Sequence, residues 1–137
     1  MPSPLWILPP RASLLMSKLP FILLMCFALT AYSAEPKKHL PLKSGTYIFK
    51  HKFAEQPDAG SSPLVVKIKG NQIAVYNRES SAVFPKGLIE KGTLVFHQKS
   101  QAWIISTSAE DINADEVGGC SDGPTMVDLM NKIYWSC

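Results

Sequence analysis

The sequence predicts an all-β fold: a small antiparallel meander of about seven short strands, closed into a barrel or sandwich and held by one disulfide. Between residues 45 and 137, apolar side chains recur at every second position in short segments, which is the period of a half-buried strand. Gly, Asn, Asp and Pro gather between these segments, as they do in turns that join neighbouring strands. An up-and-down β domain accounts for both patterns.

The N-terminal 34 residues have the composition of a secretory signal peptide. Lys18 precedes an apolar run from Leu19 to Leu29, and small and polar residues follow up to Ala34, which is the order of a signal's three regions. Eleven apolar residues fall short of the ~20 that a helix needs to cross a bilayer. We therefore expect residues 1–34 to be removed, with cleavage after Ser33 or Ala34.

Translation could start at Met16, which would give a signal peptide of ordinary length. Either start predicts an exported protein, periplasmic or secreted, with no membrane span in its mature part. Residues 35–44 contain two prolines and no periodicity, so they predict an extended lead-in, with order beginning near Gly45. Residues 45–137 then form a single β domain.

The strand segments follow one another with short connections. Residues 64–68 and 73–76 flank Gly70-Asn71, a two-residue hairpin signal. Residues 88–89 and 94–96 are separated by Gly92, and residues 126–129 and 133–137 form a closing hairpin. Some side chains are predicted to point inward, either because they fall on the apolar positions of the alternation or because they are large and apolar. They are Tyr47, Phe49, Val66, Ile68, Val75, Phe96, Trp103 and Trp135. Whether they fill the interior or line a cavity stays open.

Two cysteines, Cys120 and Cys137, remain in the mature part. In an exported chain an even pair predicts a disulfide. The bridge would close a loop of 18 residues, which the chain-entropy treatment values at roughly 3 kcal/mol. It would also tie the end of the chain to the domain.

A long segment without periodicity, Ser108 to Pro124, interrupts the meander and is the candidate binding loop. Asp111, Asn113 and Asp115 alternate as in the front half of a calcium loop, although Glu116 stands where the turn glycine is expected. The alternative is an acidic loop without metal. Further loop positions that could contact a ligand are Glu116, Gly118, Gly119, Ser121, Asp122 and Gly123.

Catalytic motifs are missing from the sequence, which contains no G-x-S-x-G, H-E-x-x-H or C-x-x-C. We assign no catalytic residue, and we expect His51 and His97 to be surface or edge imidazoles. Residues 35–108 hold eleven Lys and Arg against five Asp and Glu, whereas residues 109–137 hold one against six. Over residues 35–137 as a whole, twelve basic residues nearly balance eleven acidic residues. The sequence therefore predicts no nucleic-acid partner.

These observations leave three classes of function. The first is an exported small β-barrel that binds an unknown small molecule or protein, without a cofactor unless calcium binds. The second is a disulfide-locked inhibitor or envelope protein-interaction protein, and the third is an enzyme of unknown type. A hollow interior would favour a small ligand, and a solid one with an apolar rim would favour a protein partner.

Overall fold

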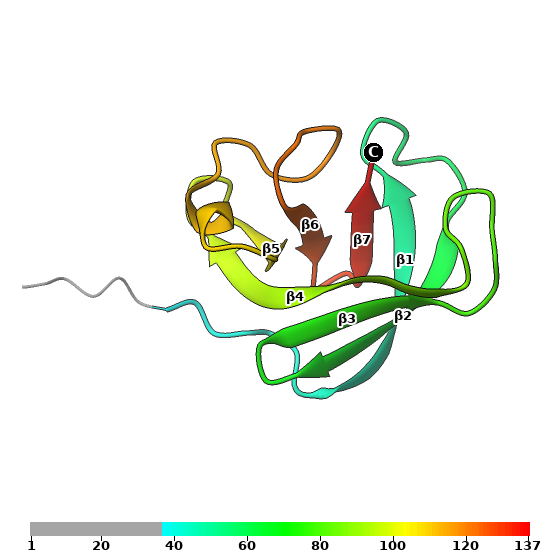
Figure 1. Ribbon diagram of the computed structural model, residues 1–137, viewed down its shortest axis with the longest axis horizontal. Helices are drawn as coiled ribbons and strands as arrows, with labels where there is room; N and C mark the ends of the chain where they lie inside the picture. The colour runs from blue at the N-terminus through cyan, green and yellow to red at the C-terminus, as the bar shows by residue number, and fades with distance from the viewer. Residues whose placement is uncertain (1–36) are drawn as a thin grey trace, which may run out of the picture. The chain divides into compact units, whose positions relative to one another are not determined.

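The computed structural model describes residues 37–137, which form the all-β fold that the sequence predicts (Figure 1). The expected signal peptide, with Met16 and both cleavage positions, lies outside the described residues. Within residues 37–137, no helix has the length and apolarity to cross a membrane. The elements are β1 (Gly45–Phe53), β2 (Ser62–Lys69), β3 (Gln72–Asn77), β4 (Gly87–His97), β5 (Ala102–Ser106), the short 3-10 helix η1 (Glu110–Asn113), β6 (Thr125–Asp128) and β7 (Ile133–Ser136).

The seven strands close into a barrel in sequence order. Consecutive strands pair antiparallel, whereas β1 and β7 pair in parallel, with Lys50 opposite Ile133 and His51 opposite Tyr134. An odd number of up-and-down strands requires this, because the first and the seventh run in the same direction. Figure 1 shows β7 beside β1. Closure pairs the two edges that an open meander would leave exposed.

Gly92 lies inside a strand and not at a turn, so the predicted division of residues 88–96 is wrong. β4 is continuous over eleven residues and curves strongly in Figure 1. A Cβ added at Gly92 would lie 2.5 Å from the carbonyl oxygen of Ser106 and 2.8 Å from a methyl carbon of Ile105. The glycine is therefore required by the close approach of β5 to a bent β4.

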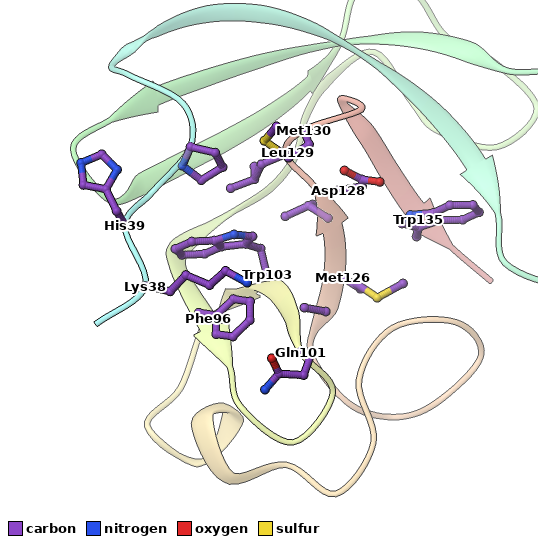
Figure 2. Close-up of a pocket in the computed structure, with 13 residues that line it drawn as sticks. Lys38, His39, Phe96, Gln101, Trp103, Met126, Asp128, Leu129, Met130 and Trp135 are labelled. Carbon is purple, nitrogen blue, oxygen red and sulfur yellow. The ribbon is translucent and has the colours of Figure 1, made fainter. Parts of the chain in front are cut away.

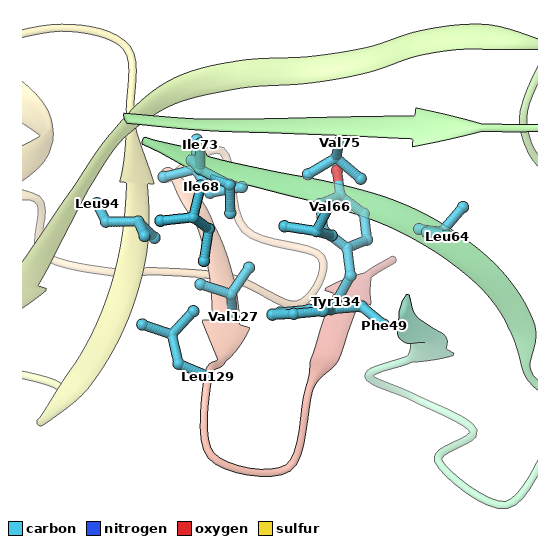
Figure 3. Packing of buried hydrophobic residues seen from close by; sticks show 11 residues of the cluster. Phe49, Leu64, Val66, Ile68, Ile73, Val75, Leu94, Val127, Leu129 and Tyr134 are labelled. Carbon is cyan, nitrogen blue, oxygen red and sulfur yellow. The ribbon is translucent and has the colours of Figure 1, made fainter. Parts of the chain in front are cut away.

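The core consists of side chains that the strands turn inward (Figure 3). Phe49, Val66, Ile68 and Val75 are at most 3% exposed, which confirms their predicted orientation. The cluster comprises Phe49, Leu64, Val66, Ile68, Ile73, Val75, Leu94, Ile105, Val127, Leu129 and Tyr134. Every strand of the barrel contributes to it, so its burial depends on closure of the whole ring.

Four aromatic residues expected in the core are only half-buried. Phe96 and Trp103 share the inner face of β4 and β5 but lie near the open end of the barrel, and Tyr47 packs at the edge of the cluster. The inward orientation of Trp135 is wrong. Its neighbour Tyr134 is 5% exposed and points inward, so the alternation along β7 sends Trp135 to the outer face.

The predicted disulfide between Cys120 and Cys137 is confirmed, with the two Cα atoms 4.5 Å apart. It joins the loop before β6 to the residue that follows β7. The bridge therefore holds the long loop against the strand that closes the barrel.

Candidate functional site

The interior of the barrel is filled, which determines where a ligand could bind. The eleven side chains of the core cluster are all between 0% and 5% exposed. Small barrels are commonly packed solid in this way. The candidate sites of the described residues are therefore hollows at the surface and at the barrel ends.

The aromatic groove lies at the end of the barrel that carries the lead-in and the turns β4–β5 and β6–β7 (Figure 2). It has a volume of about 390 Å³ and is open to solvent. The side chains that give the aromatic groove its apolar character are Phe96, Trp103, Met126, Leu129, Met130 and Trp135. Aromatic side chains and flexible methionines on one surface are typical of sites that adapt to a bound partner.

Phe96 and Trp103 form the centre of the aromatic groove. They lie opposite each other on β4 and β5, with ring centroids 5.5 Å apart and ring planes at 69°. Such an edge-to-face pair is favourable beyond the area it buries. The inner side of Trp103 packs against the core cluster, so the pair is held in a fixed orientation while its other side faces the groove.

The lead-in is ordered before Gly45, contrary to the sequence prediction. Leu40 and Leu42 pack against the core cluster, and the backbone N–H of Gly70 donates a 2.8 Å hydrogen bond to Ser44 Oγ. The Nζ atom of Lys38 lies 4.0 Å from the ring centroid of Phe96. Leu40 and Leu42 stand two positions apart, as apolar residues on one face of a strand do. This spacing is the sequence signal that could have predicted the attachment.

A polar contact crosses the interior near the other end of the barrel. The Tyr134 hydroxyl donates a 2.7 Å hydrogen bond to Glu90 Oε2. Burial of the hydroxyl and the neighbouring Glu90 carboxylate strongly raise the pKa of the Tyr134 phenol. The contact satisfies a phenol that would otherwise be buried without a partner.

This contact predicts a loss of stability at alkaline pH. Above about pH 10 the unfolded chain loses the phenolic proton of Tyr134 while the folded protein keeps it, so the free energy of unfolding falls as pH rises. In Tyr134→Phe the free energy of unfolding should decrease less steeply with pH, as measured by urea denaturation at several pH values between 9 and 11. Glu90→Gln, which keeps an acceptor oxygen but removes the charge, should reduce the slope partly. Equal slopes in the three proteins would contradict the contact.

The two strand histidines are buried, and the expectation of surface imidazoles is wrong. Each is 1% exposed. His51 Nε2 lies 2.7 Å from Ser136 Oγ, and burial lowers the pKa of the imidazole. The ring nitrogens of His97 lie 2.8 Å from Ser100 Oγ and 3.0 Å from the carbonyl oxygen of Ala114. Protein groups thus meet both ring nitrogens of His97 and the Nε2 atom of His51, which offsets the cost of burying these polar rings.

In the long loop, two of the three calcium candidates have protein partners. Asp111 Oδ2 accepts hydrogen bonds from the backbone N–H groups of Thr107 and Ser108, which lower its pKa. Asp115 is paired with Lys99, and Asn113 is an exposed residue of η1. In the described part of the chain, no three His, Cys, Asp or Glu side chains are grouped to hold a metal ion.

Calcium binding by Asp111, Asn113 and Asp115 stays a prediction with a direct thermal test. If the loop rearranges to bind the ion, the melting temperature should rise with calcium and return after addition of a chelator. Magnesium should have less effect because it demands a tighter octahedral geometry. A melting temperature unchanged by millimolar calcium would reject the site.

The remaining loop candidates form a compact turn held by the disulfide. The N–H of Gly118 donates a 2.8 Å hydrogen bond to the carbonyl of Pro124, and the Ser121 hydroxyl donates one to Gly118. A Cβ at Gly118 would lie 2.6 Å from the Cβ of Met126, and one at Gly123 would clash with the carbonyl of Glu116. Gly118 and Gly123 are thus required by packing. Gly119 is half-buried, whereas Glu116 and Asp122 are exposed to solvent.

The fold and the groove together define a small seven-stranded barrel with a solid interior and an open aromatic surface at one end. Comparison with protein-family models, with curated proteins and with solved structures found no match.

Proposed function

We propose that this chain is an exported binding module that takes a peptide segment of a protein partner in the aromatic groove. The observation that carries the proposal is the combination of a packed interior with an open apolar hollow outside it. A small apolar molecule would find no enclosed site in a packed interior, whereas small-molecule sites usually cover most of the ligand's surface. An open hollow suits a ligand that is itself part of a larger surface.

The side chains around the groove support a protein ligand. Met130 is 75% exposed, and Phe96, Trp103, Met126 and Trp135 are all half-buried at its wall. Aromatic and methionine side chains are enriched at protein interfaces, where they supply large contact areas. The disulfide-locked loop adjoins this region through the contact of Gly118 with Met126, and preorganisation of this kind lowers the entropy lost on binding.

The polar contacts inside the barrel support a structural role for their residues and not a catalytic one. The His51–Ser136 and Tyr134–Glu90 pairs join part-buried side chains, and none of these four residues lines the aromatic groove. General acid or base catalysis needs groups that a substrate can reach. We therefore assign these residues no catalytic role.

Export is the second part of the proposal. It is supported by the composition of residues 1–34 and by the Cys120–Cys137 disulfide, because disulfides persist in oxidising compartments. Protein recovered from outside the cytoplasm should begin at residue 34 or 35 and should be two hydrogens lighter than the reduced chain in a mass spectrum. A chain that retains its first residues and two free thiols would contradict export.

Selection from a random peptide library displayed on phage tests the binding site. We expect enriched peptides whose affinity for the oxidised protein falls at least tenfold in Met130→Ala and Phe96→Ala. The matched control is Ile48→Ala, because Ile48 is 49% exposed on β1 and does not line the groove. Circular dichroism would confirm that each variant is folded. Failure to enrich any peptide, or binding that survives both groove substitutions, would refute the proposal.

A further inference from the structure

We infer that the aromatic groove recognises an ammonium group, such as a lysine side chain of the bound peptide, and that Lys38 of the lead-in occupies this position until the ligand displaces it. This inference rests on the proposed function, because it names the chemistry that the same groove selects. It follows from three properties of the described residues: the ring geometry around Lys38, the charge of the groove and the weak attachment of Lys38.

The ring geometry is that of a cation–π site. The Lys38 ammonium lies 4.0 Å from the centroid of the Phe96 ring, well within the range at which the negative face of an aromatic ring attracts a cation. Trp103 meets Phe96 edge to face, and Figure 2 shows the Lys38 side chain beside both rings. The protein's own lysine therefore demonstrates which chemical group this pair of rings accommodates.

The position of Lys38 is also a boundary between two hollows. Lys38, Phe96 and Trp103 line both the aromatic groove and a second open hollow of about 500 Å³. The second hollow extends along β4 to Leu94 and to Ile112 of η1. Withdrawal of the Lys38 side chain would leave the ring pair accessible from both sides, with room for the residues on each side of a bound lysine.

Once Lys38 is withdrawn, Asp128 is the charged side chain left in the lining of the aromatic groove, and it favours a cation over an anion there. Asp128 lines the groove, and its carboxylate accepts hydrogen bonds of 2.9 Å and 2.7 Å from the backbone and side-chain N–H groups of Asn131. These bonds hold an anionic group in place at the wall. Residues 109–137, which supply β6 and the neighbouring loop, carry six acidic residues against one basic residue. Opposite charge steers a cationic ligand toward such a surface.

Lys38 is held weakly enough to be displaced. It is exposed, and among residues 37–137 the ion pair that forms is Lys99–Asp115, so Lys38 has no carboxylate partner there. The lead-in is anchored further along, where Leu40 and Leu42 reach the core cluster. An exposed cation–π contact corresponds to about a two- to fivefold change in an equilibrium constant, which an external lysine with further contacts can overcome.

A titration followed by NMR tests this inference on the oxidised mature protein. The probe is Nα-acetyl-lysine methylamide, and its uncharged counterpart is Nα-acetyl-norleucine methylamide. We expect the lysine probe to shift the indole N–H signal of Trp103 saturably and the norleucine probe to shift it at least fivefold less at equal concentration. Lys38→Met should tighten binding of the lysine probe about two- to fivefold. Lys43→Met is the matched control, since Lys43 is an exposed lysine of the lead-in that lines neither hollow, and it should leave the affinity unchanged.

The outcomes separate this inference from the proposed function. Equal shifts with both probes, or equal affinity in wild type, Lys38→Met and Lys43→Met, would overturn the role of the ammonium group and of Lys38. Peptides selected on phage would still bind in that case, and only the ligand class would be wrong. A lack of selected peptides together with no Trp103 shift in Lys38→Met would overturn both.

Discussion

Replacing Cys120 and Cys137 together with serine is expected to lower the free energy of unfolding by about 2–5 kcal/mol. A small domain is stabilised by only about 5–15 kcal/mol in total, so this change would remove a large share. The bridge spans a sequence separation of 17 residues, and without it the unfolded chain gains conformational freedom. Urea denaturation of the oxidised wild type and of the double variant measures the difference.

The fold gives a second reason for a large effect. β7 is four residues long and closes the barrel through its parallel pairing with β1. Cys137 follows it directly, so the disulfide fixes the free end of the closing strand. A chain end without such an attachment frays readily. Wild type treated with a reductant should lose as much stability as the double variant, and a loss below about 1 kcal/mol in both would show that β7 closes the barrel unaided.

The strand pattern could be predicted because period-two alternation is a local property. Phe49 on β1 and Val66 on β2 belong to different strands, yet each falls on the apolar phase of its own segment and both are fully buried. Side-chain size is a less reliable criterion than alternation. The size of Trp135 suggested the core, whereas the alternation set by the buried Tyr134 places Trp135 on the outer face. Where phase and size disagree on a strand, phase decides.

Other features depend on contacts that the local sequence does not contain. A glycine such as Gly92 is compatible with a turn or with a close approach, and only the position of Ser106 on β5 distinguishes them. His51 is buried because Ser136, 85 residues away, meets its ring. A polar residue predicts exposure unless its partner is known, and distant partners cannot be assigned from one sequence.

The candidate site was predicted in part. The sequence predicted Phe96 and Trp103 as inward side chains, and both line the aromatic groove. The attachment of Lys38 to Phe96 was not expected, because a proline-containing segment without periodicity reads as an unattached lead-in. The role of Asp111 stays open for a different reason: a carboxylate that accepts two backbone N–H bonds in a turn has the same sequence signature as a calcium ligand.

Phe49→Ala is expected to lower the free energy of unfolding by about 3–5 kcal/mol, because it removes a large buried side chain and leaves a cavity. Phe49 is 0% exposed and belongs to the core cluster that every strand shares. Its neighbour Ile48 lies on the same strand, points to the opposite face and is 49% exposed. Ile48→Ala is therefore the matched control, with an expected loss below about 1 kcal/mol.

The comparison of the two variants tests the register of β1 and hence the closed barrel. Phe49 pairs with Leu64 of β2 and Ile48 with Val65, so a shift of one residue would exchange their environments. Urea denaturation of both variants with the disulfide intact would keep the unfolded reference state the same. If Ile48→Ala cost as much as Phe49→Ala, the inner face of β1 would be assigned wrongly. A large loss at Phe49 alone would instead support a packed interior, and with it the proposal that a partner binds on the open surface, in the aromatic groove.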